Sequence, residues 1–237
     1  MVIIKRQSGF LFTVLALMFV QGITHAQGTV YSILGGVSMS TQTINGFEKD
    51  PFFRLHGLVR MESSSEISPN AGYMSLGYHT KGSAVNTYGY YDPVTGADYE
   101  GSSSSMEFHN LSLSFGVKQR KEIGTTFLSY GFGIRGDINL STDFDPVFQG
   151  LEGTENNFTY GLNFDVGWEF PLSELVSTTI EVGFYPDLSN QIYIPYQDTG
   201  YTYENGQPFT IPESAIKNVV FEARAGFRFW RKVIYTD

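Results

Sequence analysis

The stretch FTYGLNFDVGWEF, residues 158–170, alternates apolar and polar residues over thirteen positions without a break. Side chains of a β-strand point to opposite faces with period two, so one face of this segment is apolar and the other is small, polar or charged. Thirteen residues is long for a strand of a globular protein, but it suits a tilted strand that crosses a membrane with its rims. The segment therefore favours a membrane-spanning strand.

Seven further segments show the same alternation. They cover residues 30–40, 53–61, 71–80, 106–118, 127–140, 179–185 and 219–230. The fourth begins out of phase, because Met106 and Phe108 would lie on the polar face of the strand. We expect a bulge near His109 and Asn110 that turns both of them outward. With this bulge, the chain contains eight amphipathic strands.

The connections between these segments alternate in length. Long connections, at residues 41–52, 81–105, 141–157 and 186–218, follow the odd-numbered segments, and shorter ones follow the second, fourth and sixth. Long extracellular loops and short periplasmic turns have this layout in outer-membrane barrels. We therefore expect an all-β fold: an eight-stranded, closed, antiparallel transmembrane β-barrel with short periplasmic turns and long extracellular loops. The barrel must be closed, because lipid offers no hydrogen-bond partners to the backbone N–H and C=O groups at an open sheet edge.

The N-terminus has the features of a secretory signal peptide. Lys5 and Arg6 precede an apolar run over residues 10–20, and Thr24-His25-Ala26 forms a small-residue cleavage site. We expect residues 1–26 to be removed and residues 27–237 to form one barrel domain in the outer membrane of a Gram-negative bacterium. The chain has no cysteine, which excludes disulfides, a lipid-anchored cysteine and thiolate metal sites.

A soluble barrel with an apolar ligand cavity would show the same alternation. Two features favour a membrane barrel, in which the outer apolar face contacts lipid. The polar faces are rich in Gly, Ser and Asn, whereas a water-facing surface would carry many Lys and Glu. Aromatic residues make up 16% of the chain, and several lie near strand ends, where an interfacial girdle is expected. These girdle candidates are Phe158, Trp168, Phe170, Tyr185, Phe229 and Trp230.

On these patterns the chain resembles the small eight-stranded outer-membrane barrels, the group of the OmpA transmembrane domain, OmpX and OmpW-like proteins. The resemblance covers the whole mature chain and implies fold and location, but no functional residue. The Phe227-Arg228-Phe229-Trp230 close of the last strand is similar to the terminal signature read by barrel-insertion machinery, although seven residues follow it. The implied partners are therefore this machinery, outer-membrane lipid and lipopolysaccharide.

Charged residues lie on the polar faces of these segments. Eight strands enclose a space that side chains can fill, and buried charges are costly unless they are paired. We therefore expect a plugged barrel with an interior charge network. Its expected members are Arg54, Arg60, Lys118, Arg135, Asp137, Asp165, Glu169, Glu181, Glu222, Arg224 and Arg228.

Lipid-modifying enzymes also occur on small barrels, so the histidines are considered as catalytic candidates. His56 and His79 fall on the polar face and are expected to join its hydrogen bonds. His109 lies near the outer rim, but in the lipid A deacylase family a Ser follows the His by two residues, and here that position is Leu111. We expect no enzyme, no catalytic residue, no cofactor and no metal site.

Two of the long connections are rich in tyrosine. Their possible contact residues are Tyr88, Tyr90, Tyr91, Tyr99, Tyr193, Tyr196, Tyr201 and Tyr203. Tyrosine suits contacts with an extracellular protein or glycan, but packing of hairpin against hairpin explains it as well. The mature chain would carry a net charge of −11, which argues against nucleic acid.

The sequence thus predicts a non-enzymatic outer-membrane protein that acts in envelope structure or surface binding through its loops. The alternatives are a narrow transporter for a small or hydrophobic solute and, less favoured, a lipid-modifying barrel enzyme.

Overall fold

The eight alternating segments form strands in the computed structural model, which describes residues 28–43, 48–64, 69–87, 90–91, 96, 98–99, 101–202, 208–211 and 213–232. The expected signal peptide, residues 1–26, lies outside these residues. The long strands are β1 (Gly28–Gln42), β3 (Phe52–Ser64), β4 (Asn70–Thr87), β7 (Ser102–Ile123), β8 (Thr126–Phe144), β9 (Phe158–Pro171), β10 (Val176–Pro186) and β15 (Asn218–Lys232).

Several short elements lie at one end of the eight long strands. They are β2 (Glu48–Asp50), β5 (Tyr90–Tyr91), β6 (Asp98–Tyr99), the 3-10 helix η1 (Pro146–Leu151), β11 (Ile192–Ile194), β12 (Gln197–Thr202), β13 (Pro208–Ile211) and β14 (Ser214–Ile216). The described part of the chain contains no helix that is long and apolar enough to cross a membrane.

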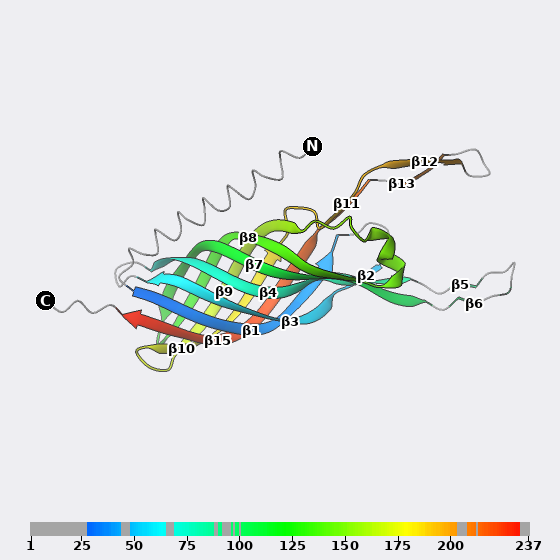
Figure 1. Cartoon of the computed structure of the whole chain (residues 1–237). Coiled ribbons are helices and arrows are strands. Elements are labelled where there is room, and N and C mark those ends of the chain that lie inside the picture. The colour runs from blue at the N-terminus through cyan, green and yellow to red at the C-terminus, as the bar shows by residue number, and fades with distance from the viewer. Residues whose placement is uncertain are drawn as a thin grey trace, which may run out of the picture.

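The long strands form one antiparallel ring. Its order is β1-β3-β4-β7-β8-β9-β10-β15, and β15 pairs with β1 over fifteen residues, from Gly28↔Lys232 to Gln42↔Asn218. The ring confirms the predicted eight-stranded barrel. Figure 1 shows the β5–β6 and β12–β13 hairpins beyond the end of the barrel opposite to the start of β1 and the end of β15.

Short turns lie at the end of the barrel where β1 begins and β15 ends. The β7–β8 turn has only two residues between the Ile123↔Thr126 pair, and Gly124 adopts a φ of 61° there. Gly carries no Cβ and adopts positive φ readily, so it suits this tight hairpin turn. The alternation of short and long connections therefore appears as expected.

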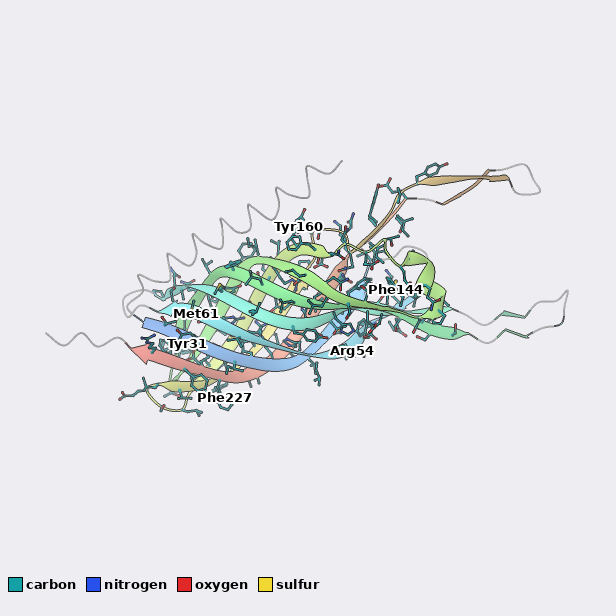
Figure 2. All side chains as sticks on the ribbon, viewed as in Figure 1. Tyr31, Arg54, Met61, Phe144, Tyr160 and Phe227 are labelled. Carbon is teal, nitrogen blue, oxygen red and sulfur yellow. The ribbon has the colours of Figure 1, made fainter. Side chains whose placement is uncertain are left out.

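Apolar side chains cover the outside of the ring, Tyr31, Tyr160 and Phe227 among them (Figure 2). Exposed members, taken strand by strand, are Ile33, Val37, Leu55, Val59, Leu76, Val117, Phe132, Ile134, Phe164, Val166, Ile180, Val182, Phe221 and Phe229. Phe132, Phe164, Phe184 and Phe221 stack from strand to strand, with ring centroids 5.1, 6.2 and 4.9 Å apart. All eight strands thus turn an apolar face outward.

The predicted bulge is present, but its effect differs from the prediction. The β7–β8 register shifts between His109 and Asn110, and the extra residue is Leu140 on β8. The inward phase of β7 therefore continues unchanged. Met106 and Phe108 point inward, 1% and 0% exposed, so the expectation that they face outward was wrong.

The β3–β4 seam is paired over only part of its length. Backbone pairing runs from Glu62↔Tyr73 to Gly57↔Tyr78, and β2 takes up pairing with β4 at Asp50↔Ala84. Between these points residues 51–56 and 79–83 face each other without ladder pairs. Here β4 passes toward the lumen, where the Gly82 N–H donates to Ser40 Oγ on β1 at 2.8 Å.

Candidate functional site

The barrel interior holds almost all of the predicted charge network. Ten of the eleven predicted members are at most 6% exposed; they are Arg60, Lys118, Arg135, Asp137, Asp165, Glu169, Glu181, Glu222, Arg224 and Arg228. Inward and outward side chains alternate along each strand, so the eight strands deliver these groups to one lumen.

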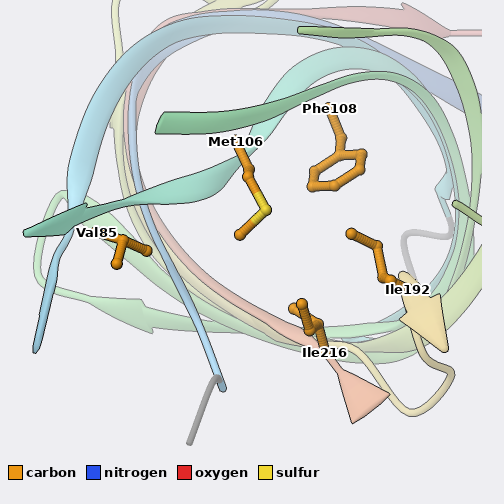
Figure 3. Close-up of a cluster of buried hydrophobic side chains, with 5 residues drawn as sticks. All are labelled: Val85, Met106, Phe108, Ile192 and Ile216. Atoms are coloured by element: carbon orange, nitrogen blue, oxygen red, sulfur yellow. The ribbon is translucent and has the colours of Figure 1, made fainter. Parts of the chain in front are cut away.

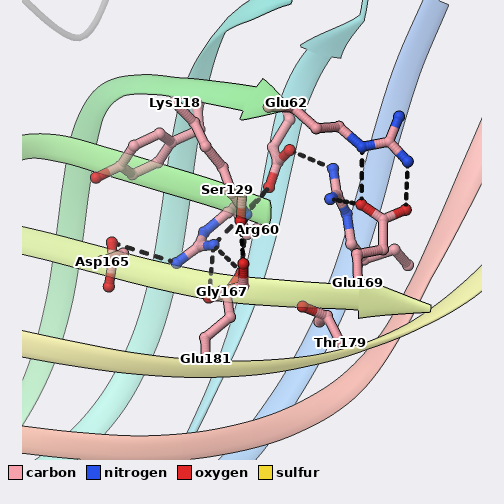
Figure 4. Close-up of polar contacts among 12 residues, drawn as sticks. Arg60, Glu62, Lys118, Ser129, Asp165, Gly167, Glu169, Thr179 and Glu181 are labelled. Atoms are coloured by element: carbon pink, nitrogen blue, oxygen red, sulfur yellow. Dashed lines mark hydrogen bonds and ion pairs between the residues drawn. The ribbon is translucent and has the colours of Figure 1, made fainter. Parts of the chain in front are cut away.

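The network begins near the short turns, where Glu62 and Glu169 share several cations (Figure 4). Lys118 Nζ donates to Glu62 Oε1 at 3.2 Å, and Arg228 contacts both carboxylates. Arg120 makes a two-point contact with Glu169, at 3.0 and 2.8 Å. Two parallel N–H donors fix the planar carboxylate in orientation as well as in position.

Glu181 occupies the middle of the lumen and accepts from three cations. Arg60 Nη1 lies 3.0 and 2.9 Å from its two oxygens, Lys118 Nζ lies 2.8 Å from Oε1, and Arg224 donates twice to Oε2. These donors come from β3, β7 and β15, so one carboxylate ties three strands together across the barrel.

Tyr185 also lies in the interior. The sequence predicted it in the outer aromatic girdle, but it is only 4% exposed and bonds Asp165 and Arg224. Its ring lies over Gly183, where an added Cβ would come within 2.5 Å of ring carbons. The girdle expectation was therefore wrong for Tyr185, because the missing side chain at Gly183 leaves room for the ring inside.

Trp230 departs from the girdle expectation in a similar way. Its ring lies 4.7 Å from the Arg120 guanidinium and 5.7 Å from that of Arg228. It therefore covers the short-turn end of the charge network.

A second group of charges lies closer to the long loops. Lys81 Nζ donates to Asp137 Oδ2 at 2.6 Å, to Asp187 Oδ1 at 2.7 Å and to Thr159 Oγ1 at 3.3 Å. Arg135 Nη2 donates to the same Asp187 oxygen at 2.8 Å. Both carboxylates thus lie between a lysine and an arginine.

The two interior histidines join this group. His79 Nδ1 lies 3.1 Å from Glu222 Oε1, and His79 Nε2 lies 3.4 Å from Asp137 Oδ1. His56 Nδ1 lies 3.5 Å from the other Glu222 oxygen. These contacts place both rings in the polar interior, where the sequence predicted them.

Arg54 differs from the other predicted members. Its side chain is 44% exposed and pairs with Glu107 of β7 instead of the lumen carboxylates. The reason is the open part of the β3–β4 seam, where β4 passes beneath β3. An added Cβ on Gly82 would lie 2.8 Å from the Phe52 ring, so the inward face of β3 rests on β4 here and does not reach the lumen.

Four interior charges were missed by the sequence analysis: Glu62, Lys81, Arg120 and Asp187. Each lies one alternation step beyond a predicted strand end, two residues after Arg60, His79, Lys118 and Tyr185 respectively. Extension of the period-two pattern by one step would have found them. The observed strands β3, β4 and β7 are longer than the predicted segments for the same reason.

An apolar cluster lies inside the ring on the long-loop side (Figure 3). Val85, Met106, Phe108, Ile192 and Ile216 are at most 2% exposed and pack with Phe144, Phe148, Leu151 and Ile194. Below the cluster, Gln42 Nε2 donates to Asn218 Oδ1 at 3.1 Å, and Asn218 Nδ2 donates to Asp187 Oδ2 at 3.1 Å. Gln42 and Asn218 therefore link the cluster side of the lumen to the loop-side ion pairs.

Few of the predicted tyrosine contacts can be placed. Tyr193 and Tyr196 are 43% and 59% exposed. Tyr193 donates to Glu213 Oε1 at 3.0 Å, and the adjacent carboxylate raises the pKa of the phenol because it disfavours a phenolate. The backbones of Tyr90, Tyr91, Tyr99 and Tyr201 lie in β5, β6 and β12, while Tyr88 and Tyr203 lie outside the described residues.

His109 lies on the outer rim of the barrel. Its Nε2 is 3.0 Å from Asp143 Oδ2, and its Nδ1 is 2.7 Å from Tyr78 Oη and 3.2 Å from Thr80 Oγ1. No serine hydroxyl takes part in the described contacts of this ring. Within the described ranges, no group of three or more His, Asp or Glu side chains could hold a metal ion.

We compared the chain with known protein families, curated sequences and solved structures. No family model matches the chain, and no curated protein sequence matches it. Among solved structures, the outer membrane protein OprG of Pseudomonas aeruginosa is 10% identical with a TM-score of 0.52, over 89% of this chain and 100% of that chain.

Two other solved structures are similar over comparable lengths. Neisserial surface protein A is 9% identical over 88% of this chain and 98% of its own, with a TM-score of 0.45. The attachment invasion locus protein Ail of Yersinia pestis, solved with the heparin analogue sucrose octasulfate, is 12% identical over 86% and 99%, with a TM-score of 0.39. The OprG match by itself shows that the fold is that of a small outer-membrane β-barrel.

Proposed function

We propose that this chain is a non-catalytic outer-membrane protein with a closed lumen, which acts in envelope structure or in surface binding through its extracellular loops. One observation carries the proposal: ion pairs fill the interior from Glu169 to Lys81, and the apolar cluster around Phe108 covers them on the long-loop side. An eight-stranded barrel has only enough interior for side chains, so this filling leaves no room for a solute channel.

The outward apolar face supports residence in lipid, and the long loops then face the cell exterior. The exposed Tyr193 and Tyr196 side chains support a contact role for this side, since tyrosine offers a large, rigid contact area. The partners of the barrel itself are lipid, lipopolysaccharide and the insertion machinery. Cleavage after Ala26 belongs to the same proposal.

The composition of the loops narrows the class of extracellular ligand. Segments 43–51, 88–101, 145–157 and 188–217 together contain eleven acidic residues, two lysines and no arginine. Such a surface repels sulfated or phosphorylated polymers. A protein or a neutral glycan is therefore the better candidate ligand.

Solute flux tests the closed lumen. Wild-type protein in planar bilayers or liposomes should show no conductance and no solute-dependent swelling above the lipid control. Arg135→Ala and Glu169→Ala should lower stability, whereas Lys217→Ala, which removes a lysine outside the interior, should not. Saturable flux of a small solute through the wild type, altered by these interior substitutions, would contradict the proposal.

A narrow transporter is the second candidate, and the open part of the β3–β4 seam favours it. Only side chains span this part of the wall, through the Arg54–Glu107 pair and the Phe52 ring beside Gly82. If the seam is a route, Arg54→Ala and Glu107→Gln should each change solute uptake into liposomes. Under the closed-lumen proposal both variants stay as impermeable as the wild type.

A further inference from the structure

A half-open cavity of about 30 Å³ lies between the two groups of ion pairs, and the wall residues Gly57, Leu58 and Tyr78 belong to its lining. Part of its lining consists of the small residues Ser75 and Gly77 of β4 and Ser112 and Ser114 of β7. Large charged side chains from the other strands do not fill the space beside them. A volume of about 30 Å³ is enough for at least one water molecule or one monatomic ion of similar size.

Several polar atoms of the lining residues have no protein partner. Arg135 and Arg60 are both 2% exposed, yet Arg135 Nη1 and Arg60 Nε make no hydrogen bond. A buried charged donor without an acceptor is strongly unfavourable, because it has lost its hydrogen bonds to water. The geometry therefore leaves guanidinium N–H groups of two arginines in need of an acceptor.

Asn163 also belongs to the lining of the cavity. Its Nδ2 contacts Tyr73 Oη, and its Oδ1 has no partner. A tyrosine hydroxyl both donates and accepts, so exchange of the amide oxygen and nitrogen keeps this contact. Such an exchange replaces the unpaired oxygen with an unpaired NH₂ group.

The carboxylates at the cavity are already occupied. Asp165 accepts from Tyr185 and Arg224, and Glu222 accepts from Arg224 and faces His79. The lining contains three arginines against these two carboxylates. Positive charge is therefore in excess around the cavity itself.

The charge balance of the whole interior also depends on His79. His79 Nδ1 is hydrogen-bonded to Glu222 at 3.1 Å, and His79 Nε2 lies 3.4 Å from Asp137 without a hydrogen bond. Two carboxylates this close favour the protonated imidazole. The other buried cations are Arg60, Lys81, Lys118, Arg135, Arg224 and Arg228. The buried carboxylates are Glu62, Asp137, Asp165, Glu169, Glu181, Asp187 and Glu222.

Half-buried Arg120, which pairs with Glu169, brings these cations to seven against seven carboxylates. A protonated His79 adds one positive charge to this balanced set, in a low-dielectric interior. Such a charge is costly unless a counter-charge accompanies it.

We infer that the cavity is a binding site for one small monovalent anion of halide size. The guanidinium groups of Arg135 and Arg60 and the hydroxyls of Ser112 and Ser114 hold the ion. It supplies the missing negative charge and the missing acceptor at one point, so it stabilises the plugged interior. The site is independent of any ligand of the loops.

Bromide is the probe, because it matches chloride in charge and scatters anomalously. Wild-type protein in detergent is melted at constant ionic strength while sodium bromide replaces sodium gluconate. The melting temperature should rise with bromide and saturate, and crystals grown in bromide should show an anomalous peak in the cavity. A bromide-independent melting temperature, or peaks only on the surface from an adventitious ion, would overturn the inference.

Ser114→Val fills the cavity without removal of a charge and should abolish the saturable rise. Ser104→Val is the matched control, because Ser104 lies on the same strand and is similarly buried, 7% against 6%, but does not line the cavity. The control should keep the bromide response. Equal responses of the two variants would contradict the site.

Arg135→Lys provides a second route if Ser114→Val does not fold. It keeps the positive charge but removes Nη1, and should weaken apparent bromide affinity at least tenfold. Unchanged bromide affinity would exclude Arg135 as a ligand and with it the proposed site.

Discussion

The buried Lys81 ammonium group lies 2.7 Å from the Asp187 carboxylate, although 106 residues separate the two in the chain. The contact joins β4 to the segment that follows β10, across the lumen from wall to wall. Asp137 of β8 contacts the same ammonium group at 2.6 Å. Three parts of the ring are therefore held at one level by a single lysine.

Replacement of this lysine should be costly. Lys81→Met leaves Asp137 and Asp187 without their shared cation, and loss of one partner of a buried ion pair costs about 3–5 kcal/mol. The free energy of unfolding in lipid vesicles, measured with urea, should fall by this amount. Lys217→Met, at a half-buried lysine with no ion pair among the described contacts, should change it by less than about 0.5 kcal/mol. Equal stability of the two variants would contradict the role of Lys81.

Gly82→Ala should disrupt the point where β4 passes beneath β3. Gly82 has a φ of 143°, and an added Cβ would lie 1.9 Å from the Met106 carbonyl oxygen. Backbone strain alone costs about 1–3 kcal/mol, and the clash adds to it. The fraction of protein that refolds into detergent micelles should therefore drop sharply. Gly150→Ala, where an added Cβ meets nothing within 4 Å, is the control and should refold as the wild type does.

A charge on the outward face should be penalised according to its depth. Val166 is 49% exposed in the middle of β9, and an arginine at the bilayer midplane of a barrel costs about 2–4 kcal/mol. Val166→Arg should therefore destabilise the vesicle-embedded protein. Leu188→Arg, at a similarly exposed leucine beyond the end of β10, should have little effect. A tolerated arginine at position 166 would mean that this face does not contact lipid.

Electrophoresis and terminal sequencing check location and processing together. A closed barrel resists SDS when unheated, so the outer-membrane fraction should contain a band whose mobility changes on boiling. The mature protein should begin at Gln27. Recovery in the soluble periplasmic fraction without a mobility shift would instead favour a soluble barrel with a ligand in its cavity.

Period-two alternation was enough to predict the eight strands, because it is a local property of each segment. It also assigned ten of the eleven predicted charges to the interior, since a side chain two residues along a strand returns to the same face. The same rule, carried one step further, would have added Glu62, Lys81, Arg120 and Asp187.

Departures from the prediction occur where one strand depends on its neighbour. The bulge near His109 could be expected from the phase of β7, but its extra residue lies on β8, so Phe108 stayed inside. Arg54 has the parity of an interior residue, yet β4 passes beneath it and Glu107 takes its charge. Tyr185 is a different case, because it has the inward parity of Glu181 and Gly183 on its own strand and Gly183 leaves room for its ring.

The sequence by itself thus determined the strands, the two faces of the wall and the end that carries the long loops, because each depends on residue spacing along one chain segment. Only the tertiary structure decided which charges pair, where the β3–β4 seam opens and where a cavity remains between ion pairs. These features depend on strand register and on the side chains that several strands place at one level of the lumen, and no single segment contains that information.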